Sequence, residues 1–221
     1  MVVITGTSSG IGRATALYFL EKGEEVSGID IRPSTIHHPR YTHYVADMTK
    51  KEELPNIPGV EVLYANAGVQ NSRDDIDVNL KGTMNIVEKY AFQPSIKSVL
   101  FSASSSARNG YEFPAYCASK AGVVGYMKNV AWRLAEKYHA TCNSISFGGV
   151  WTDLNKPVTQ DPELMKRIMD VTPLKKWTKP EECAKWAYFL TRVNTSCTGQ
   201  DILVDNGEND LNCTFVWPDK E

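Results

Sequence analysis

A phenol and an ammonium group stand four residues apart in the segment Tyr116-Cys117-Ala118-Ser119-Lys120. In a helix this spacing places the two side chains on one face. Tyrosine and lysine both titrate at a pKa of roughly 10, and a cation held beside a phenol lowers the phenol pKa toward the working range. We therefore predict that Tyr116 is a general acid/base supported by Lys120. Because the pattern is loose, an incidental pair on a solvated helix face is the alternative.

A glycine-rich turn, Thr5-Gly6-Thr7-Ser8-Ser9-Gly10-Ile11-Gly12, connects the first apolar run to a helical pattern. Glycines let the backbone approach a pyrophosphate, and a helix N-terminus offers it free N–H groups and a partial positive charge. The spacing differs from the common G-x-G-x-x-G, and no Gly-Lys-Ser/Thr follows, which excludes a P-loop. A plain structural turn is the alternative. The residues predicted to contact a dinucleotide here are Gly6, Ser8, Ser9, Gly10, Ile11 and Gly12.

Asp30 ends the second apolar run, at about the distance from Gly12 at which an acidic side chain reaches an adenosine ribose. A carboxylate there accepts hydrogen bonds from the ribose hydroxyls and repels a 2′-phosphate. Arg32 is the counter-evidence, because a guanidinium could pair with that phosphate. We predict NAD as the cofactor, with Asp30 and the adjacent Ile31 at its adenosine.

Short apolar runs alternate with longer helical patterns along the chain. The expected strands are Val2–Thr5, Glu25–Asp30, Tyr41–Ala46, Val60–Ala65, Ser98–Ser104, Thr141–Phe147 and Ile202–Val204, and the expected helices are Ile11–Lys22, Asp75–Tyr90, Tyr116–Tyr138 and Pro180–Thr191. This alternation predicts an α/β fold, a doubly wound, Rossmann-like parallel sheet in three α/β/α layers. The link Lys50–Gly59 is short and polar, so we expect a truncated crossover there. In such a sheet, ligands bind at the carboxyl ends of the strands.

These motifs together resemble the short-chain dehydrogenase/reductase family, over Val2 to about Gly207. The similar segments are the Thr5–Gly12 turn, Ala65-Asn66-Ala67-Gly68, Val78-Asn79-Leu80-Lys81-Gly82, Tyr116–Lys120, Ala46-Asp47-Met48-Thr49, and the closing strand from Thr198-Gly199-Gln200 to Asp205-Asn206-Gly207. Each motif is weak alone, but six in the right order and spacing make a chance match very improbable.

The resemblance implies hydride transfer between nicotinamide and a secondary alcohol or ketone. Tyr116 would exchange the proton, Lys120 would lower its pKa and bind the nicotinamide ribose, and Asn79 would support a water that carries protons to solvent. The further cofactor contacts that the resemblance implies are Asp47, Met48, Asn66, Ala67, Gly68, Tyr116, Lys120, Val150 and Thr152.

Two segments depart from the family pattern. The active-site serine usually stands 13 residues before the tyrosine, where this chain has Ala103, flanked by Ser102 and Ser104. We favour Ser104, which requires a loop shortened by one residue, and keep Ser102 as the alternative. The family's Pro-Gly is Phe147-Gly148 here, so the following loop, with Val150 and Thr152, is expected to differ in shape.

Length and composition exclude several classes of protein. With 221 residues and a formal charge of −2, we expect one dinucleotide-binding domain at 1–207, a tail at 208–221, and no nucleic-acid partner. Five widely spaced cysteines without a Cys-x-x-Cys pair predict neither a disulfide framework nor a metal site. The sequence shows no signal peptide and no membrane-spanning run, so a cytoplasmic protein without a membrane partner is expected.

The substrate is the least determined feature. The segment Trp151–Trp177 could be a lid over an apolar ligand or could pack on the body, and we favour packing. The short Lys50–Gly59 link resembles the hydroxysteroid dehydrogenase and carbonyl reductase branch, which favours a hydrophobic substrate. Aromatic residues in the tail predict a homodimer or homotetramer.

Two other functions remain open. A non-catalytic dinucleotide-binding regulatory protein is favoured by the uncertain serine but disfavoured by Tyr116, Lys120 and Asn79. An NADP-dependent reductase of 3-oxoacyl thioesters is disfavoured by Asp30.

Overall fold

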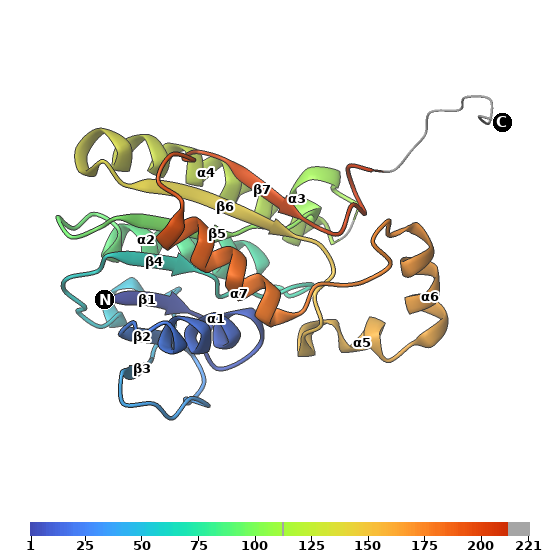
Figure 1. Cartoon of the computed structure of the whole chain (residues 1–221), viewed down its shortest axis with the longest axis horizontal. Helices are drawn as coiled ribbons and strands as arrows, with labels where there is room; N and C mark the ends of the chain where they lie inside the picture. Colours follow the sequence, from blue (N-terminus) through green and yellow to red (C-terminus); the bar gives the residue numbers. More distant parts are fainter. Residues whose placement is uncertain (112, 212–221) are drawn as a thin grey trace.

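The computed structural model describes residues 1–111 and 113–211, and its centre is a seven-stranded sheet (Figure 1). All neighbouring strands are parallel, in the order β3-β2-β1-β4-β5-β6-β7. The strands are β1 (Val2–Thr5), β2 (Val26–Asp30), β3 (Tyr41–Val45), β4 (Val62–Ala65), β5 (Ser98–Ser102), β6 (Thr141–Phe147) and β7 (Asp201–Val204). The strand order reverses between β1 and β4, which creates a crevice at their carboxyl ends. The predicted doubly wound α/β fold is confirmed.

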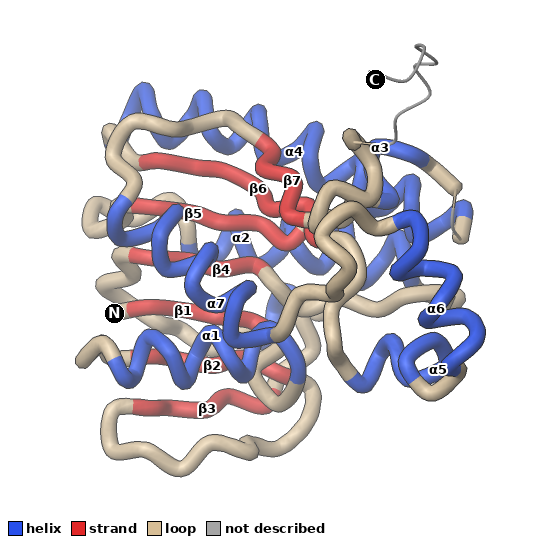
Figure 2. The backbone as a smooth tube through the Cα atoms, turned by 45° about the vertical axis from the view of Figure 1, so that its right-hand side comes forward, coloured by secondary structure: helices blue, strands red, loops and turns tan. Residues whose placement is uncertain are grey.

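Helices cover both faces of the sheet (Figures 1 and 2). One face packs against α1 (Gly10–Glu21) and α7 (Pro180–Tyr188), whose buried side chains share a core cluster with those of β1 and β4. The other face packs against α2 (Thr83–Tyr90) and α4 (Pro114–Tyr138) in a second cluster. These two apolar layers hold the strand ends, and the loops that follow them, in fixed positions.

Two crossovers lack an α-helix. The link between β3 and β4 contains only a short 3-10 turn, η1 (Lys51–Glu53), as the polar Lys50–Gly59 segment predicted. The link between β2 and β3, residues 31–40, contains no helix either, in agreement with the expected elements, which include no helix between Asp30 and Tyr41. The edge of the sheet at β3 is therefore covered by loops.

The segment between β6 and α7 extends beyond the carboxyl ends of the strands (Figure 2). It contains η3 (Asp153–Asn155), α5 (Lys156–Thr159) and α6 (Pro162–Val171), and α6 has no buried residue. Its ends are joined where the Trp151 N–H donates to the Thr178 carbonyl at 3.0 Å and the Thr178 N–H donates to the Gly149 carbonyl at 3.0 Å. Leu164, Met165, Ile168 and Met169 of α6 are half-buried, and Thr172 and Trp177 are buried. The packing that we favoured for the segment Trp151–Trp177 stays a prediction.

Several boundaries differ from the predicted ones. Strand β5 ends at Ser102, before Ser104. The expected helix Asp75–Tyr90 begins as a π-helix, η2 (Ile76–Gly82), and α7 continues as a second π-helix, η4 (Phe189–Val193). A short helix, α3 (Ser106–Asn109), follows β5. Within the described residues, no helix is long and apolar enough to cross a bilayer.

Candidate active site

The glycine-rich turn between β1 and α1 forms a tight cradle. Gly6 has a φ of +78°, which favours glycine, and a Cβ on Gly12 would lie 2.2 Å from the Gly6 carbonyl oxygen. Ser9 caps α1 without a side-chain hydrogen bond to the first turn. The first N–H groups of the helix thus have neither an intrahelical acceptor nor a side-chain cap, and they can bind an anion.

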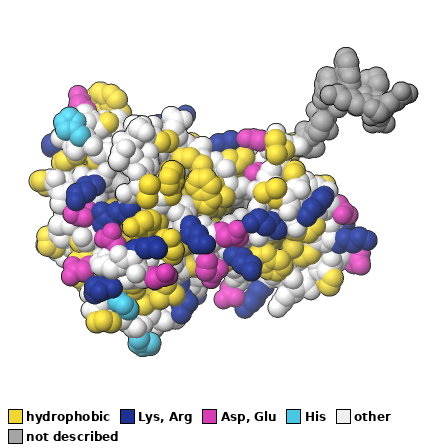
Figure 3. Space-filling model, in the orientation of Figure 1, with side chains coloured by type: hydrophobic (Ala, Val, Ile, Leu, Met, Phe, Trp, Pro, Cys, Tyr) yellow, Lys and Arg dark blue, Asp and Glu magenta, His cyan; other side chains and the backbone are white. Residues whose placement is uncertain are grey.

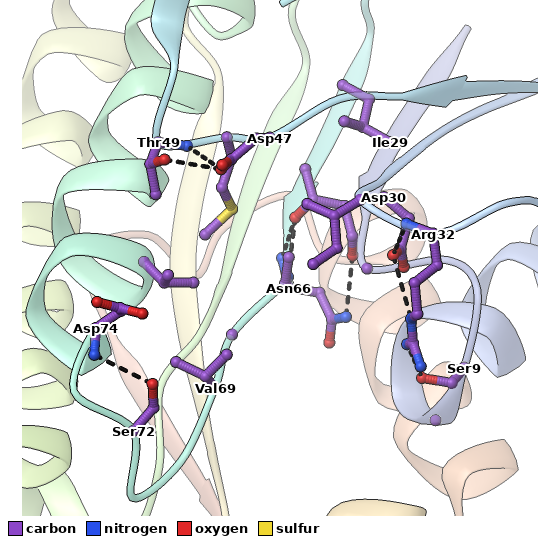
Figure 4. A pocket seen from close by; sticks show the side chains of 18 of the residues that line it. Ser9, Ile29, Asp30, Arg32, Asp47, Thr49, Asn66, Val69, Ser72 and Asp74 are labelled. Carbon is purple, nitrogen blue, oxygen red and sulfur yellow. Dashed lines mark hydrogen bonds and ion pairs between the residues drawn. The ribbon is translucent and has the colours of Figure 1, made fainter.

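A cavity of about 1030 Å³, called the larger cavity below, opens beside this turn. In Figure 4, Ser9, Asp30 and Arg32 lie on one side of it and Asp47 and Thr49 on the other. The predicted cofactor residues that line it are Gly6, Ser9, Gly10, Ile11, Asp30, Ile31, Asp47, Met48, Asn66, Ala67, Gly68 and Thr152. The structure thus brings together residues from four strand ends, as the parallel topology predicts.

Ser8 and Gly12 belong to the same turn but do not line the larger cavity. The Ser8 N–H donates to the Asp30 carboxylate at 2.9 Å, and its hydroxyl donates to the Pro33 carbonyl at 2.9 Å. Gly12 supports the turn by allowing the close approach to Gly6 described above. Both residues therefore support the glycine-rich turn without lining the larger cavity.

The Asp30 carboxylate is buried and held at the mouth of the cradle. One oxygen accepts the Ser8 N–H and the other accepts the Arg32 N–H, each at 2.9 Å. The Arg32 guanidinium extends back over the turn, with Nη2 2.6 Å from Ser9 Oγ and Nε 3.6 Å from Asp30 Oδ1. The acid is thus fixed in place, and among the described residues the only cation in contact with it is the exposed side chain of Arg32.

A second cavity of about 770 Å³, called the smaller cavity below, adjoins the first and shares Asn66, Gly68 and Thr152 with it. Tyr116 and Lys120 both line this cavity from the first turns of α4. The Lys120 ammonium lies 5.8 Å from the centroid of the Tyr116 ring. The expected pair therefore shares one helix face, and that face is not the solvated surface of the alternative interpretation.

Lys120 is a buried cation with a perturbed pKa. Its Nζ donates to the Ser102 carbonyl at 2.9 Å, and only 5% of the residue is exposed. Burial lowers the pKa of Lys120 from 10.5 to about 8, and the nearby Asp75 carboxylate opposes this shift. A lysine that titrates near neutral pH beside a phenol can influence proton transfer to and from that phenol.

Asn79 lies in the π-helix η2 and is completely buried. Its amide donates to the Val69 carbonyl at 2.9 Å and to Ser119 Oγ at 3.0 Å, and Oδ1 accepts the Val69 N–H at 2.8 Å. A Cβ on Gly68 would lie 2.8 Å from Asn79 Oδ1 and 3.4 Å from Lys120 Nζ. The side chain thus ties η2 to α4 beside Lys120, and π-helical turns of this kind are frequent at functional sites.

The two candidate serines have different surroundings. The Ser102 hydroxyl is 2.7 Å from the Tyr64 hydroxyl and donates to Asn66 Oδ1 at 3.1 Å. The Ser104 hydroxyl donates to Ser106 Oγ at 3.2 Å, and both candidates line the smaller cavity. Ser104 Oγ also accepts the Ser106 N–H at 3.2 Å, so each candidate has two partners within the protein, and the choice of Ser104 stays a prediction.

The loop after β6 closes one side of the smaller cavity. Val150 and Thr152 line it, and a Cβ on Gly10 would meet Thr152 Cγ2 at 3.5 Å, so this loop reaches the start of α1. Trp177 packs against Gly149, where an added Cβ would lie 1.9 Å from the indole ring. The altered loop shape expected from Phe147-Gly148 stays a prediction.

Two residues of the site were missed from the sequence. Asp75 is a buried carboxylate whose charge acts on Lys120, and its position one turn before Asn79 was an available signal. Trp177 reaches Gly149 through the fold of the intervening segment, so no local pattern could indicate it. In residues 1–111 and 113–211, no group of His, Cys, Asp and Glu side chains could hold a metal ion.

A sequence model described as enoyl-(acyl carrier protein) reductase matches residues 6–209, and the fold and both cavities agree with this match. The chain belongs to the short-chain dehydrogenase/reductase family. It is 29% identical to an NAD-dependent glycerol dehydrogenase of Listeria innocua, over 94% of this chain and 92% of that protein. It is also 29% identical to the 3-oxoacyl-acyl-carrier-protein reductase FabG of Thermotoga maritima, over 93% and 96%.

A solved structure shows the same architecture. A 4-hydroxyisoleucine dehydrogenase mutant complexed with NADH and succinate superposes with a TM-score of 0.82 at 25% identity, covering 94% of this chain and 98% of that one. As a member of the short-chain dehydrogenase/reductase family, the protein is an oxidoreductase that uses a nicotinamide cofactor.

Proposed function

We propose that the protein is an NAD-dependent dehydrogenase or reductase that acts on a secondary alcohol or ketone with apolar substituents. The observation that carries this proposal is the Tyr116–Lys120 pair, which lines a cavity directly beside the glycine cradle. When bound, the nicotinamide supplies the hydride acceptor or donor. The chain supplies orientation, proton transfer and electrostatics.

Each residue of the pair and its neighbours has a separate task. Tyr116 takes the proton from the alcohol, or returns it to the oxygen in the reverse direction, and the Lys120 ammonium favours the phenolate form. The Ser104 hydroxyl binds the substrate oxygen and stabilises charge that develops on it. Asn79 holds η2 against α4, so that protons can leave the Lys120 end of the site through water. Val150 and Thr152 border the nicotinamide.

The surroundings of Asp30 favour NAD over NADP. A fixed carboxylate accepts hydrogen bonds from the ribose hydroxyls of NAD and repels the 2′-phosphate of NADP. Arg32 offers one exposed guanidinium, which already contacts Ser9 and Asp30. The likeness to an NAD-dependent glycerol dehydrogenase and to an NADH complex supports this choice.

The walls of the smaller cavity favour an uncharged, apolar substrate. Beyond Tyr116 and Lys120, its wall residues include Val69, Tyr111, Phe113, Leu154, Val158, Ile168 and Trp177. Lys120 is the only lysine or arginine among the described residues that line the cavity. The cavity is also lined by Asn66, Gln70, Ser102, Ser104, Thr152, Asn155 and the carboxylate of Glu208. The apolar part of the wall suits a carbonyl compound of the hydroxysteroid kind, and the Glu208 carboxylate disfavours an anion.

We also propose that the protein forms a homodimer or homotetramer. The tail aromatic residues on which the sequence prediction rested, Phe215 and Trp217, lie outside the described residues. Trp186 and Phe189, at the end of α7, are partly exposed with their ring centroids 6.2 Å apart, and hydrophobic side chains gather on this face (Figure 3). Light scattering should show that Trp186→Glu reduces the mass of the assembly.

The decisive experiment combines cofactor titration with a substrate screen. Calorimetric titration should show tighter binding of NAD than of NADP. On secondary alcohols and ketones, Tyr116→Phe should lower kcat by roughly 10²- to 10⁴-fold without changing the Kd for NAD. Tyr126→Phe, on the same helix, is the matched control because the Tyr126 hydroxyl contacts the exposed Glu88 instead. Tight NAD binding without Tyr116-dependent turnover on any of these compounds contradicts the proposal.

A further inference from the structure

The loop that carries Asp30 and Arg32 has no helix to support it, because the β2–β3 crossover is helix-free. Side chains of the edge strand β3 fill this role. Tyr41 and His43 share one face of β3, since side chains two residues apart in a strand point the same way. Both extend toward the glycine-rich turn and the loop, as their contacts show.

The Tyr41 side chain passes over β2 at Gly28. A Cβ on Gly28 would lie 2.1 Å from the Tyr41 hydroxyl oxygen and 2.4 Å from Thr7 Oγ1, so any side chain at this position would displace the phenol. Through this gap the hydroxyl groups of Tyr41 and Thr7 are hydrogen-bonded to each other, with 2.8 Å between the Tyr41 oxygen and Thr7 Oγ1. Thr7 is fully buried inside the glycine-rich turn. Strand β3 is thus joined directly to the cradle.

His43 continues the chain of contacts to the loop. Its Nδ1 is 2.7 Å from the Tyr41 hydroxyl, and its Nε2 is 2.9 Å from the Arg32 carbonyl oxygen. Because a carbonyl only accepts, Nε2 carries the proton in this contact. The Arg32 N–H donates to Asp30 at 2.9 Å, so the Arg32 backbone is held on both sides.

The chemistry of Tyr41 suits a permanent hydrogen-bonding role. Burial, the larger cause, and the nearby Asp30 carboxylate raise the pKa of Tyr41 above its ordinary value, so the group stays a neutral phenol. Neither Tyr41 nor His43 lines the larger cavity. Their influence on a bound cofactor must therefore act through Thr7, Arg32 and Asp30.

We propose that Tyr41 and His43 are positioning residues for the adenosine end of the cofactor, because the chain Thr7–Tyr41–His43–Arg32 holds the Asp30 loop against the glycine-rich turn. This inference rests on the proposed function only for the identity of the cofactor. It assigns to β3 the support that a crossover helix could otherwise give, and it predicts that cofactor affinity depends on side chains that do not touch the cofactor.

The test is calorimetric titration of Tyr41→Phe, His43→Ala and the double variant with NAD and NADP, without substrate. Each single variant should raise the Kd for NAD by roughly two- to tenfold, the effect of losing one hydrogen bond. The Kd of the double variant for NAD should not exceed the higher of the two single-variant Kd values, because either substitution interrupts the same chain of hydrogen bonds. Binding of NADP should change less, so that the preference for NAD decreases.

Tyr44→Phe is the matched control. It removes the same hydroxyl from the same strand, but the Tyr44 ring packs in the opposite core layer. Thermal melting of each variant checks that the apo fold is retained, and kcat at saturating NAD should be unchanged. A Kd for NAD within twofold of wild type in both single variants, or an equal rise in Tyr44→Phe, overturns the inference.

Failure of this inference and failure of the proposed function are distinguishable. If the wild type binds neither NAD nor NADP, both are overturned. If the wild type binds NAD and turns over alcohols through Tyr116 while the Tyr41 and His43 variants bind NAD equally well, only the positioning role is lost.

Discussion

The larger and the smaller cavity share an edge at Asn66, Gly68 and Thr152 but are built from different kinds of chain. The larger cavity is formed mainly by strand ends, the first turn of α1 and η2, and hydrogen bonds within the protein fix several of its polar groups. Only residues 152–154 of the segment between β6 and α7 line it. The smaller cavity takes more of its wall from this segment, including Val158, Ile168 and Trp177, and the segment joins the body at its ends. We therefore expect the first cavity to be preorganised and the second to adapt to its ligand.

This difference has a physical cause. A dinucleotide presents the same phosphates and ribose in every reaction, so a fixed set of N–H groups and one carboxylate suffices to bind it. A substrate varies in shape, and an apolar wall with exposed residues such as Tyr111 accommodates that variation at little cost. Substitutions should accordingly separate cofactor binding from substrate selection.

The largest effect is expected at the boundary between the cavities. Lys120→Met should reduce kcat by roughly 10²- to 10⁴-fold, because the phenol at Tyr116 loses the neighbouring cation. The free energy of unfolding at neutral pH should not fall and could rise by up to about 3 kcal/mol, since a buried charge is removed. Equilibrium denaturation and initial rates measure the two quantities, and a large loss of stability would contradict this assignment.

The pH dependence of stability tests the lowered pKa of Lys120. Folding lowers the pKa of Lys120 from 10.5 to about 8, so between these values the unfolded chain holds a proton that the folded chain has released. The stability of the wild type should therefore rise with pH in this window relative to Lys120→Met, and the difference between the two proteins should shrink. Equilibrium denaturation of both proteins at a series of pH values measures this difference. A difference that does not change with pH would contradict the prediction.

The second-largest effect is expected for cofactor binding in the larger cavity. Gly12→Ala places a Cβ 2.2 Å from the Gly6 carbonyl and 2.6 Å from Asn66 Nδ2, so the turn must shift. We expect the Kd for NAD to rise by roughly 100-fold, the effect of misplacing a binding group by about an ångström. Gly125→Ala is the control, because nothing lies within 4 Å of its added Cβ. Calorimetric titration with NAD gives the Kd of both variants. An unchanged Kd in Gly12→Ala would contradict the prediction, because the turn would then accommodate the added Cβ.

The third effect concerns cofactor choice. Asp30→Asn keeps an acceptor for the Ser8 or Arg32 N–H but removes the charge that would repel a 2′-phosphate. The ratio of the Kd values for NADP and NAD should fall by roughly 10- to 100-fold. Fluorescence titration with both dinucleotides gives the ratio. An unchanged ratio would mean that selection lies elsewhere, with Arg32 the next residue to test.

The sequence predicted residues set by local spacing far better than contacts between distant segments. The Gly6–Gly12 turn, Asp30 and the Tyr116–Lys120 pair are encoded by local spacing, and the parallel topology then brings them together without further information. The roles of Trp177, Tyr41 and His43 depend on side chains crossing to distant segments. Their contacts require a particular gap, such as Gly28 or Gly149, that no periodicity reveals.

The smallest effect is expected for substrate preference at the smaller cavity. Trp177 packs on Gly149, lines the smaller cavity, and has a buried indole N–H with no hydrogen-bond partner in the described structure. Trp177→Phe removes this N–H and enlarges the cavity slightly. We expect the relative kcat/KM for bulky and small ketones to change by roughly three- to tenfold, in favour of the bulky ones, because a small volume change in an apolar pocket has an effect of this order.

The Kd for NAD should stay within twofold of wild type in Trp177→Phe, since the indole does not line the larger cavity. Gly149→Ala is the complementary variant: its Cβ would lie 1.9 Å from the ring and would push the indole away from its present site. If both variants alter substrate preference and neither alters NAD binding, the two cavities are energetically separate. A matching loss of NAD affinity would show instead that the segment between β6 and α7 also stabilises the cofactor site.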